Sequence, residues 1–340
     1  MLVVILCLCN KIRTGTKLIE ASSQFISSNP SILVVPFIQI LKLFLFWTWW
    51  TFTFALLFSI GDIRYDPGDL FGDLVWSDQN TVFIVFFSFA LFWGTAFIIS
   101  GTQMVVAFKT IDWYFNHLNL SRSYIGISRA YAWTYCRHIG SIAFGSFWIS
   151  LLWAVQALLQ FIYAKLKEVG KDSYWLKCAM SCVACIERVI SFVNRHIYVE
   201  VALRNVNFFG AASEFIRLGL NNFLDVAVIS ALSTLFLFFG SALISGVITV
   251  IGYFILEAYG KSVNERFDTL GPLIVIFLIA FVICTIINTV FEISIDAILH
   301  CYVLEKSVSE RRMQQVQHVP DSFKEVINEN EQYIPLRDPY

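Results

Sequence analysis

Two groups of polar residues recur at helical spacing within otherwise apolar stretches of the sequence. The first group consists of Asn288, Glu292, Asp296 and His300. The second group consists of Glu187, Ser191, Asn194 and Tyr198, with Arg188 and Arg195 beside it. Because residues three or four positions apart lie on one face of an α-helix, each group predicts a polar stripe along one side of a helix.

The chemistry of these stripes depends on what they face. A charged side chain at the centre of a membrane-spanning helix costs roughly 2.5 to 3.5 kcal/mol on insertion scales, so it normally faces a cavity or a partner. One interpretation is that two polar helix faces line a path for a solute. The other is that Glu292 and Asp296 pair with Arg188 or Arg195 and hold the helices together. The two interpretations do not exclude each other.

Aromatic residues supply a second kind of chemistry. The chain contains 10 Trp, 13 Tyr and 33 Phe, and Trp49, Trp93 and Trp148 lie in three different apolar stretches. A Trp ring attracts a quaternary ammonium group by about 2 kcal/mol or more when the site is desolvated. The same rings also form interfacial belts in membrane proteins, so their abundance alone does not identify a cation site.

Other chemistry finds little support in the sequence. Cys178, Cys182 and Cys185 have no neighbouring His before His196 to complete a zinc site, so we expect packing or acylation instead. The 259–262 segment ends like a phosphate-binding loop but lacks the earlier glycine. No hydrolase motif appears. The sequence therefore predicts neither an enzyme nor an ATP-driven pump, and it predicts no metal and no cofactor.

The composition indicates which elements carry these groups. Of 340 residues, 57% are hydrophobic and 14% are charged, whereas a soluble domain has about 45–50% and 25%. A net charge of −1 excludes a basic nucleic-acid surface. We expect an all-α polytopic transmembrane helical bundle in the lipid bilayer. Six stretches are long enough to span it, at residues 31–60, 80–107, 139–164, 178–203, 226–256 and 271–299.

The third and fourth of these spans need separate comment. Ser141 and Gly145 form a small-x3-small pair, which allows a neighbouring helix to approach closely. The 178–203 span is interrupted by charged residues. If that segment lies in the membrane interface instead of crossing the bilayer, every later segment of the chain lies on the opposite side of the membrane from the one predicted here.

The segments outside the spans set the expected topology. Residues 1–9 form the remnant of a transmembrane helix, and residues 10–30 form a basic cytosolic loop. The acidic 61–79 loop lies outside, which places a polar tail at residues 304–340 in the cytosol. Residues 205–222 are expected to form an amphipathic helix on the membrane surface.

Several motifs occur in a fixed order along the chain. They are Lys11-Ile12-Arg13, Pro36-Phe37, Arg137 to Ser146, Cys182 with Cys185 and Glu187, Asn194 with Tyr198, Asn207-Phe208, and Asp296 with Cys301. Over about 300 residues this ordered set resembles the choline transporter-like family. Three family elements differ here. The element N-x-N-A-Y reads Asn194-Arg195-His196-Ile197-Tyr198, and Asn-Phe-Cys reads Asn207-Phe208-Phe209. The D-G after the last helix is replaced by Lys306-Ser307-Val308-Ser309.

The resemblance, together with the two polar stripes in an aromatic-rich bundle, implies a carrier of choline or a related organic cation that supplies a phospholipid precursor. With no ATP site in the sequence, transport would be driven by a gradient. The transmembrane domain would cover residues 31–303. The substrate-binding or pathway residues would be Asp296, Glu292, Asn194, Tyr198, Glu187, Trp49, Trp93 and Trp148. The carboxylates would attract the cation or take part in a coupled proton step, Asn194 and Tyr198 would make polar contacts, and the rings would hold the ammonium.

Family members begin with further helices and an extracellular loop that bears Cys residues. Compared with them, this chain is expected to be the C-terminal portion of such a protein. The alternative function is a non-transporting membrane scaffold or an incomplete subunit of a transporter. We expect the plasma membrane as its location, with an internal membrane as the alternative, and the sequence leaves homo- and hetero-oligomers open.

Overall fold

The computed structural model describes residues 2–64, 73–116, 125–168, 173–263 and 270–312, together with His318 and Pro320. Apart from two three-residue strands, the regular elements in these ranges are helices. In chain order they are α1 (Leu2–Ser28), η1 (Pro30–Leu33), α2 (Val34–Phe58), β1 (Asp62–Arg64), β2 (Asp73–Val75), α3 (Asp78–Asn116), α4 (Ile127–Arg137), α5 (Ile139–Glu168), α6 (Tyr174–Arg204), α7 (Phe208–Val263) and α8 (Leu270–Arg312). The all-α fold class predicted from the sequence is confirmed.

Five helical segments in the described ranges are long and apolar enough to cross a membrane. They lie at Pro30–Phe58, Asp78–Asn116, Ile139–Glu168, Val228–Ala258 and Leu270–Ser309, which overlap five of the six predicted spans. The remaining predicted span, at residues 178–203, corresponds to α6. It is a full helix, but it is not among the five because charged residues interrupt its apolar run. That α6 crosses the membrane stays a prediction.

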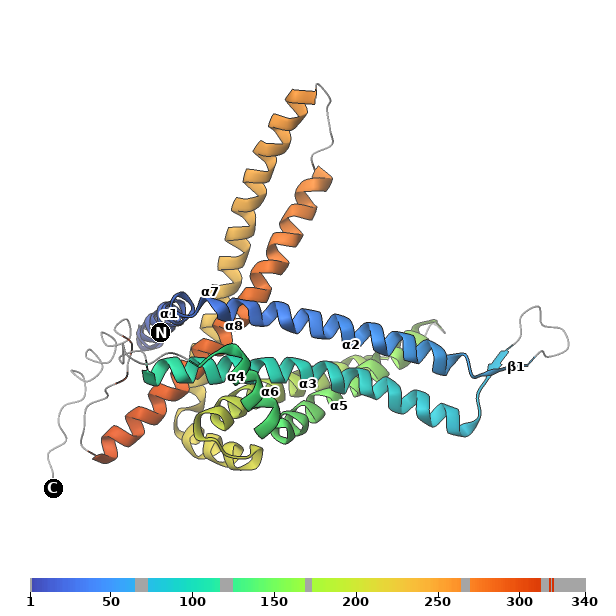
Figure 1. Ribbon diagram of the computed structural model, residues 1–340, viewed down its shortest axis with the longest axis horizontal. Helices are drawn as coiled ribbons and strands as arrows, with labels where there is room; N and C mark the ends of the chain where they lie inside the picture. Colours follow the sequence, from blue (N-terminus) through green and yellow to red (C-terminus); the bar gives the residue numbers. More distant parts are fainter. Residues whose placement is uncertain are drawn as a thin grey trace.

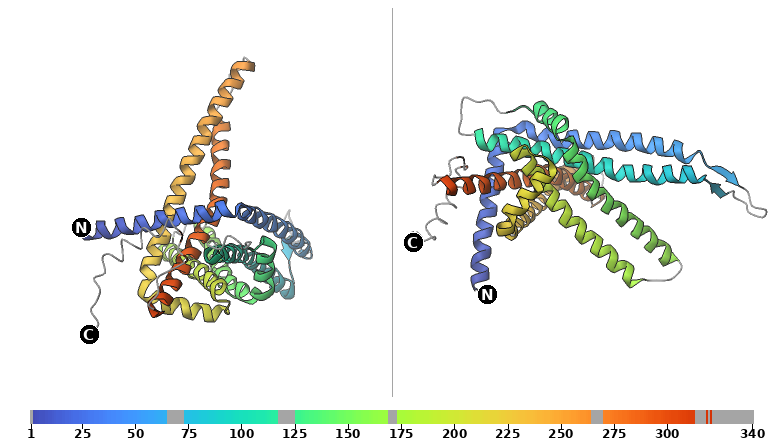
Figure 2. Two further views of the ribbon diagram at one scale, coloured as in Figure 1. Left: turned by 60° about the vertical axis from the view of Figure 1, so that its left-hand side comes forward. Right: turned by 90° about the horizontal axis from the view of Figure 1, so that it is seen from below.

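The long helices pair into three antiparallel hairpins, α2 with α3, α5 with α6, and α7 with α8 (Figure 1). β1 and β2 close the first hairpin as an antiparallel pair in which Ile63 lies opposite Leu74. The views in Figure 2 show that the outer halves of the hairpins point in different directions from a shared junction. The spans are therefore not parallel to one another along their whole length.

Burial separates the junction from the outer hairpins. Leu18 and Phe25 of α1, Tyr114 of α3 and Ile298 of α8 are fully buried in one core at the junction. By contrast, large apolar side chains of the outer hairpins, such as Phe52, are more than half exposed. A soluble monomer does not show apolar surface of this extent, whereas lipid acyl chains cover it in a bilayer. The chain is thus an integral membrane protein with a packed junction.

The prediction of a loop at residues 10–30 was wrong, because this segment belongs to the continuous helix α1, followed by η1. Leu18, Ala21 and Phe25 recur at helical spacing and are completely buried, and α1 packs on α7 and α8. Two of the basic residues that suggested a loop are compatible with this packing, because Arg13 is exposed and Lys17 pairs with Glu20 at 3.1 Å. Burial of one apolar face therefore outweighs the polar character of the segment.

The separate surface helix predicted at residues 205–222 is also corrected. Asn205 ends α6 in the left-handed conformation with φ 55°, and α7 then runs from Phe208 to Val263 without interruption. The segment is amphipathic as predicted, with Phe208 and Phe215 buried and Phe209 exposed, but its apolar face packs on protein. In Figure 2 the first part of α7 lies across the junction and its long second part leads away from it.

The polar tail predicted at residues 304–340 begins later than expected. Helix α8 continues to Arg312, so the first part of that segment is helical. The remainder, except for His318 and Pro320, lies outside the described residues.

Close packing between α5 and α6 depends on the absence of a side chain at Gly145. A Cβ atom added there would overlap the hydroxyl of Tyr198 and would lie 2.9 Å from Cε2 of Phe208. Both rings are buried, so neither can move away from an added Cβ as the end of an exposed, flexible side chain could. The small-x3-small pair in the sequence thus marks a real close approach, as its spacing predicts.

We expect Gly145→Ala to lower the free energy of unfolding by about 1 to 3 kcal/mol, because two buried aromatic rings must move. The matched control is Gly140→Ala on the same helix, where no atom lies within 4 Å of the added Cβ. The control should be neutral or slightly stabilising. Denaturant unfolding of the purified protein in detergent micelles measures both effects, and equal midpoints for the two variants would contradict this account of the helix contact.

Candidate functional site

A single arginine joins three helices at the centre of the junction. Arg195 of α6 forms ion pairs with two carboxylates of α8, at 2.7 Å from its Nε to Oδ2 of Asp296 and 3.3 Å from its Nη1 to Oε2 of Glu292. Its Nη2 also donates a hydrogen bond of 3.2 Å to Oγ of Ser230 in α7. Ser230 in turn donates to Oδ1 of Asp296 at 2.8 Å.

This arrangement confirms that an arginine pairs with the acidic stripe of α8, one of the two interpretations of the sequence. The Asp296 side chain is 1% exposed and its charge is balanced by Arg195, so it is not open to a solute. Glu292 is partly accessible, with 26% of its side chain exposed. Arg188, the other arginine considered, is exposed and makes no ion pair in the described part of the chain.

A cavity of about 730 Å³ opens beside this ion pair. Its lining comes from four helices, with Gln103 of α3, Glu187, Arg188, Ser191, Phe192 and Arg195 of α6, Ser230 and Thr234 of α7, and Glu292 of α8 among its residues. Its volume lies within the range of about 300 to 1,000 Å³ that is usual for small-molecule sites. The stripes therefore also line a space, and that this space is a path for a solute stays a prediction.

Glu187 is the carboxylate of this cavity that lacks a cationic partner. Its Oε1 accepts hydrogen bonds from Nε1 of Trp153 at 3.2 Å and from Oγ of Ser191 at 3.0 Å. Within the described ranges, no Lys, Arg or His forms an ion pair with it. Two neutral donors orient a negative charge without cancelling it. The cavity thus holds one fixed anion that a cationic ligand could neutralise.

The C-terminal part of the α6 stripe faces α5 instead of the cavity. Asn194 is 4% exposed and its Nδ2 donates a 2.8 Å hydrogen bond to the carbonyl oxygen of Gly145 in α5. Tyr198 is fully buried against the same glycine. Neither residue lines the cavity. These two predicted site residues hold α5 against α6 in this structure.

The tryptophans predicted to bind an ammonium group do not meet at the cavity. Trp49, Trp93 and Trp148 lie on α2, α3 and α5, are 57%, 38% and 44% exposed, and do not line it. The aromatic residues at the cavity are Trp153, which contacts Glu187, and Phe192, which lines the wall. No sequence signal distinguishes Trp153 from Trp148, because only the pairing of α5 with α6 places one of them beside a carboxylate.

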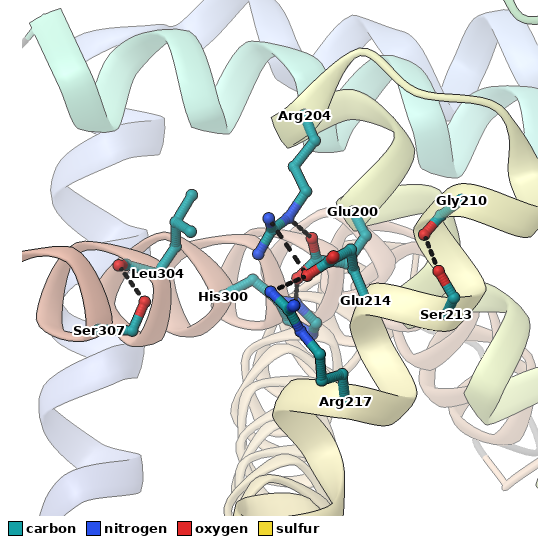
Figure 3. A network of polar contacts seen from close by, with 9 residues as sticks. All are labelled: Glu200, Arg204, Gly210, Ser213, Glu214, Arg217, His300, Leu304 and Ser307. Atoms are coloured by element: carbon teal, nitrogen blue, oxygen red, sulfur yellow. Dashed lines mark hydrogen bonds and ion pairs between the residues drawn. The ribbon is translucent and has the colours of Figure 1, made fainter. Parts of the chain in front are cut away.

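The remaining members of the α8 stripe bind other helices. Asn288 donates a 3.0 Å hydrogen bond to the carbonyl oxygen of Leu237 in α7. His300 lies in a chain of polar contacts, 2.8 Å from Nδ1 of His196 and 3.0 Å from Oε1 of Glu200. Figure 3 shows this chain continuing through Arg204 and Glu214 to Arg217 at the protein surface. Polar groups of the stripe are therefore mostly used in contacts between helices.

The cysteines at the start of α6 lie away from these networks. Cys178, Cys182 and Cys185 are all exposed with free thiols. Among the residues described, no group of three or more His, Cys, Asp or Glu side chains is placed to hold a metal ion.

Known proteins resemble this chain over most of its length. The model of a family described as plasma-membrane choline transporter matches residues 1–307. Choline transporter-like protein 2 of Dictyostelium discoideum is 27% identical over 303 residues, which cover 88% of this chain and 47% of the relative.

Two vertebrate relatives give a similar picture. Choline transporter-like protein 1 of Rattus norvegicus is 25% identical over 286 residues, covering 83% of this chain and 42% of the relative. Choline transporter-like protein 1 of Torpedo marmorata is 28% identical over 278 residues, covering 78% and 41%. The chain spans somewhat less than half the length of these relatives.

We expect Arg195→Met to lower the free energy of unfolding by about 3 to 5 kcal/mol, because it leaves Asp296 buried without a counter-charge. The double variant Arg195→Met/Asp296→Asn should recover much of this loss, since it removes the uncompensated charge as well. Thermal unfolding of the purified protein in detergent micelles provides the measurement.

Arg188→Met is the control, because Arg188 is exposed on the same helix without an ion pair in the described ranges. It should change stability by less than about 0.5 kcal/mol. If Arg195→Met were as mild as this control, the ion pairs would not hold the junction together.

Proposed function

Since this chain belongs to the plasma-membrane choline transporter family, we propose that it carries choline or a related organic cation across a membrane, driven by a gradient and not by ATP. The chain matches less than half the length of its relatives, so the activity of a whole family member is part of the proposal. The observation that carries it is a single uncompensated carboxylate, Glu187, in a cavity between four helices.

The electrostatics of the cavity support a cation over an anion or a neutral solute. Three carboxylates lie in or beside it, Glu187, Glu292 and Asp296. Two cations oppose them, the ion-paired Arg195 and the exposed Arg188 of the lining, so one net negative charge remains. Arg195 binds both carboxylates of α8, whereas Glu187 forms no ion pair in the described ranges and is the carboxylate open to a cationic ligand. A ligand with one positive charge would neutralise it without breaking the ion pair at the junction.

The remaining lining suits a quaternary ammonium group. Such a group has no N–H to donate and carries methyl groups, so it binds through charge and aromatic contact instead of hydrogen bonds. Phe192 supplies an aromatic ring in the wall, and Trp153 reaches Glu187 from α5. Ser191, Ser230 and Thr234 bring hydroxyl groups to the same cavity, which could accept or donate hydrogen bonds with the hydroxyl of choline.

This proposal assigns different roles to the acidic residues expected at the site. Glu187 is the primary attraction for the cation, and Glu292 is a second carboxylate at the wall. Asp296 fixes Arg195 through an ion pair of 2.7 Å and so shapes the cavity without touching the solute.

The driving force would come from the membrane potential. Moving one positive charge through 100 mV provides about 2.3 kcal/mol, enough for an accumulation of tens-fold. We propose the plasma membrane as the location, with the C-terminal end of α8 in the cytosol, because Lys and Arg favour the cytosolic side in the loops.

We expect Glu187→Gln to reduce kcat/KM for choline uptake by about tenfold, because the substitution removes the charge and keeps an oxygen that accepts hydrogen bonds from Trp153 and Ser191. Uptake of radiolabelled choline into liposomes that contain the purified chain, with an imposed inside-negative potential, is the measurement. The uncharged analogue 3,3-dimethyl-1-butanol should compete equally well with choline in both proteins, since its binding does not depend on the negative charge of Glu187.

The matched control is Glu168→Gln, which removes a carboxylate from the exposed end of α5, where it pairs with Lys165. Its uptake should equal that of the unchanged chain. Uptake by Glu187→Gln at the unchanged rate would refute the role of Glu187. Uptake by the unchanged chain no faster than leakage into empty liposomes would favour the alternative, a membrane scaffold or partial subunit.

A further inference from the structure

A second cavity, of about 460 Å³, lies where α4 meets α5 and where α6 turns into α7. Its lining consists of Arg137, His138, Gly140, Ser141, Phe144, Asn205, Val206, Asn207, Phe208 and Phe209. It shares no residue with the cavity beside Arg195. The lining contains no Asp or Glu, so its charge has the opposite sign to that of the first cavity.

Two helix N-termini open into this space. Helix α5 begins at Ile139 and helix α7 at Phe208. The backbone N–H groups of Gly140 and Ser141 have no acceptor within the described ranges, and the first bond of this turn runs from Ile142 to the carbonyl of His138. Free N–H groups at a helix N-terminus, together with the helix dipole, favour a bound anion.

Ser141 provides a second, independent indication of a ligand. The residue is 8% exposed, it lines the cavity, and its hydroxyl group has no hydrogen-bond partner among the described residues. A hydroxyl that lines a cavity without a partner is free to donate, so a ligand that accepts its hydrogen bond would be stabilised there. At the adjacent Gly140, no atom lies within 4 Å of the position of a Cβ, which leaves the helix end accessible.

Cationic and polar side chains complete the site. Arg137 is exposed at its edge and forms no ion pair in the part of the chain that the structure describes. His138 is 7% exposed, held by a 3.0 Å hydrogen bond between its Nε2 and Oδ1 of Asn205 and by the ring of Trp133 at 4.3 Å. An arginine beside a helix N-terminus matches the fork geometry of phosphate oxygens.

An aromatic wall adjoins this polar end. Phe144 contacts Phe208 and Phe209, with ring centroids 5.2 and 4.9 Å apart. Phe209 is 65% exposed on the apolar surface of the protein. A ligand with a phosphate group and an apolar part could therefore occupy the cavity and the surface beside it together.

We propose that this second cavity is a binding site for a phosphate-bearing anion, which hydrogen-bonds to Arg137, Ser141 and the N-terminus of α5. Two sources share this chemistry, the headgroup of an anionic phospholipid and a free phosphate compound. The aromatic wall suits the lipid, and the experiment separates the two sources.

The test uses the purified full chain and two probes. Native mass spectrometry of protein released from nanodiscs of phosphatidylglycerol and phosphatidylcholine measures bound phospholipid. Thermal unfolding with inorganic phosphate, compared with chloride at equal ionic strength, measures binding of the free anion. Arg137→Gln should weaken binding of the active probe by about tenfold and Ser141→Ala by about threefold.

Arg129→Gln is the matched control, because Arg129 is also exposed on α4 but does not line the cavity. It should bind both probes like the unchanged chain. Retention of phosphatidylglycerol alone identifies the lipid, and stabilisation by inorganic phosphate alone identifies a free anion. Either result supports the proposal when Arg137→Gln and Ser141→Ala weaken the binding. Binding of neither probe, or binding that Arg137→Gln and Ser141→Ala leave unchanged, overturns it.

Discussion

The junction of this protein depends on a largely enclosed cation, Arg195, whose charge must be compensated. Arg195 lies between two carboxylates of α8 and a hydroxyl of α7, so its charge fixes the relative positions of α6, α7 and α8. In surroundings of low dielectric constant, an unpaired charge of either sign would be very costly, which makes the three partners interdependent. Apolar packing alone gives little preference for one register, because much of the exposed surface of the outer hairpins is apolar.

The same requirement decides which groups remain available for a ligand. Since Arg195 forms ion pairs with both α8 carboxylates, Glu187 is the carboxylate of the first cavity that has no ion pair in the described ranges. At the second cavity no carboxylate is present, and the free N–H groups at the start of α5 leave the balance positive beside Arg137. The helices thus enclose two cavities whose linings carry opposite net charge.

Periodicity located the long helices because apolar runs of spanning length have few alternatives to a helix in a bilayer. At residues 10–30 composition suggested a loop where the chain is helical, and at residues 205–222 periodicity gave the amphipathic helix but not the surface that it packs on. Whether Leu18 and Phe25, or Phe208 and Phe215, face protein or lipid depends on neighbours that are distant in sequence. Local composition carries no information about those neighbours, so helix ends and partners could not be predicted there.

The sequence by itself determined that the protein is helical and membrane-embedded and that two stripes of polar residues run along α6 and α8. It also identified Arg195 as one of two candidate partners for Asp296. Only the tertiary structure decided that Arg195 is that partner, that Asn194 faces α5, and that Trp153 contacts Glu187. The physical reason is that spacing fixes the face of a helix a residue occupies, whereas charge compensation and close packing between helices fix what that face meets.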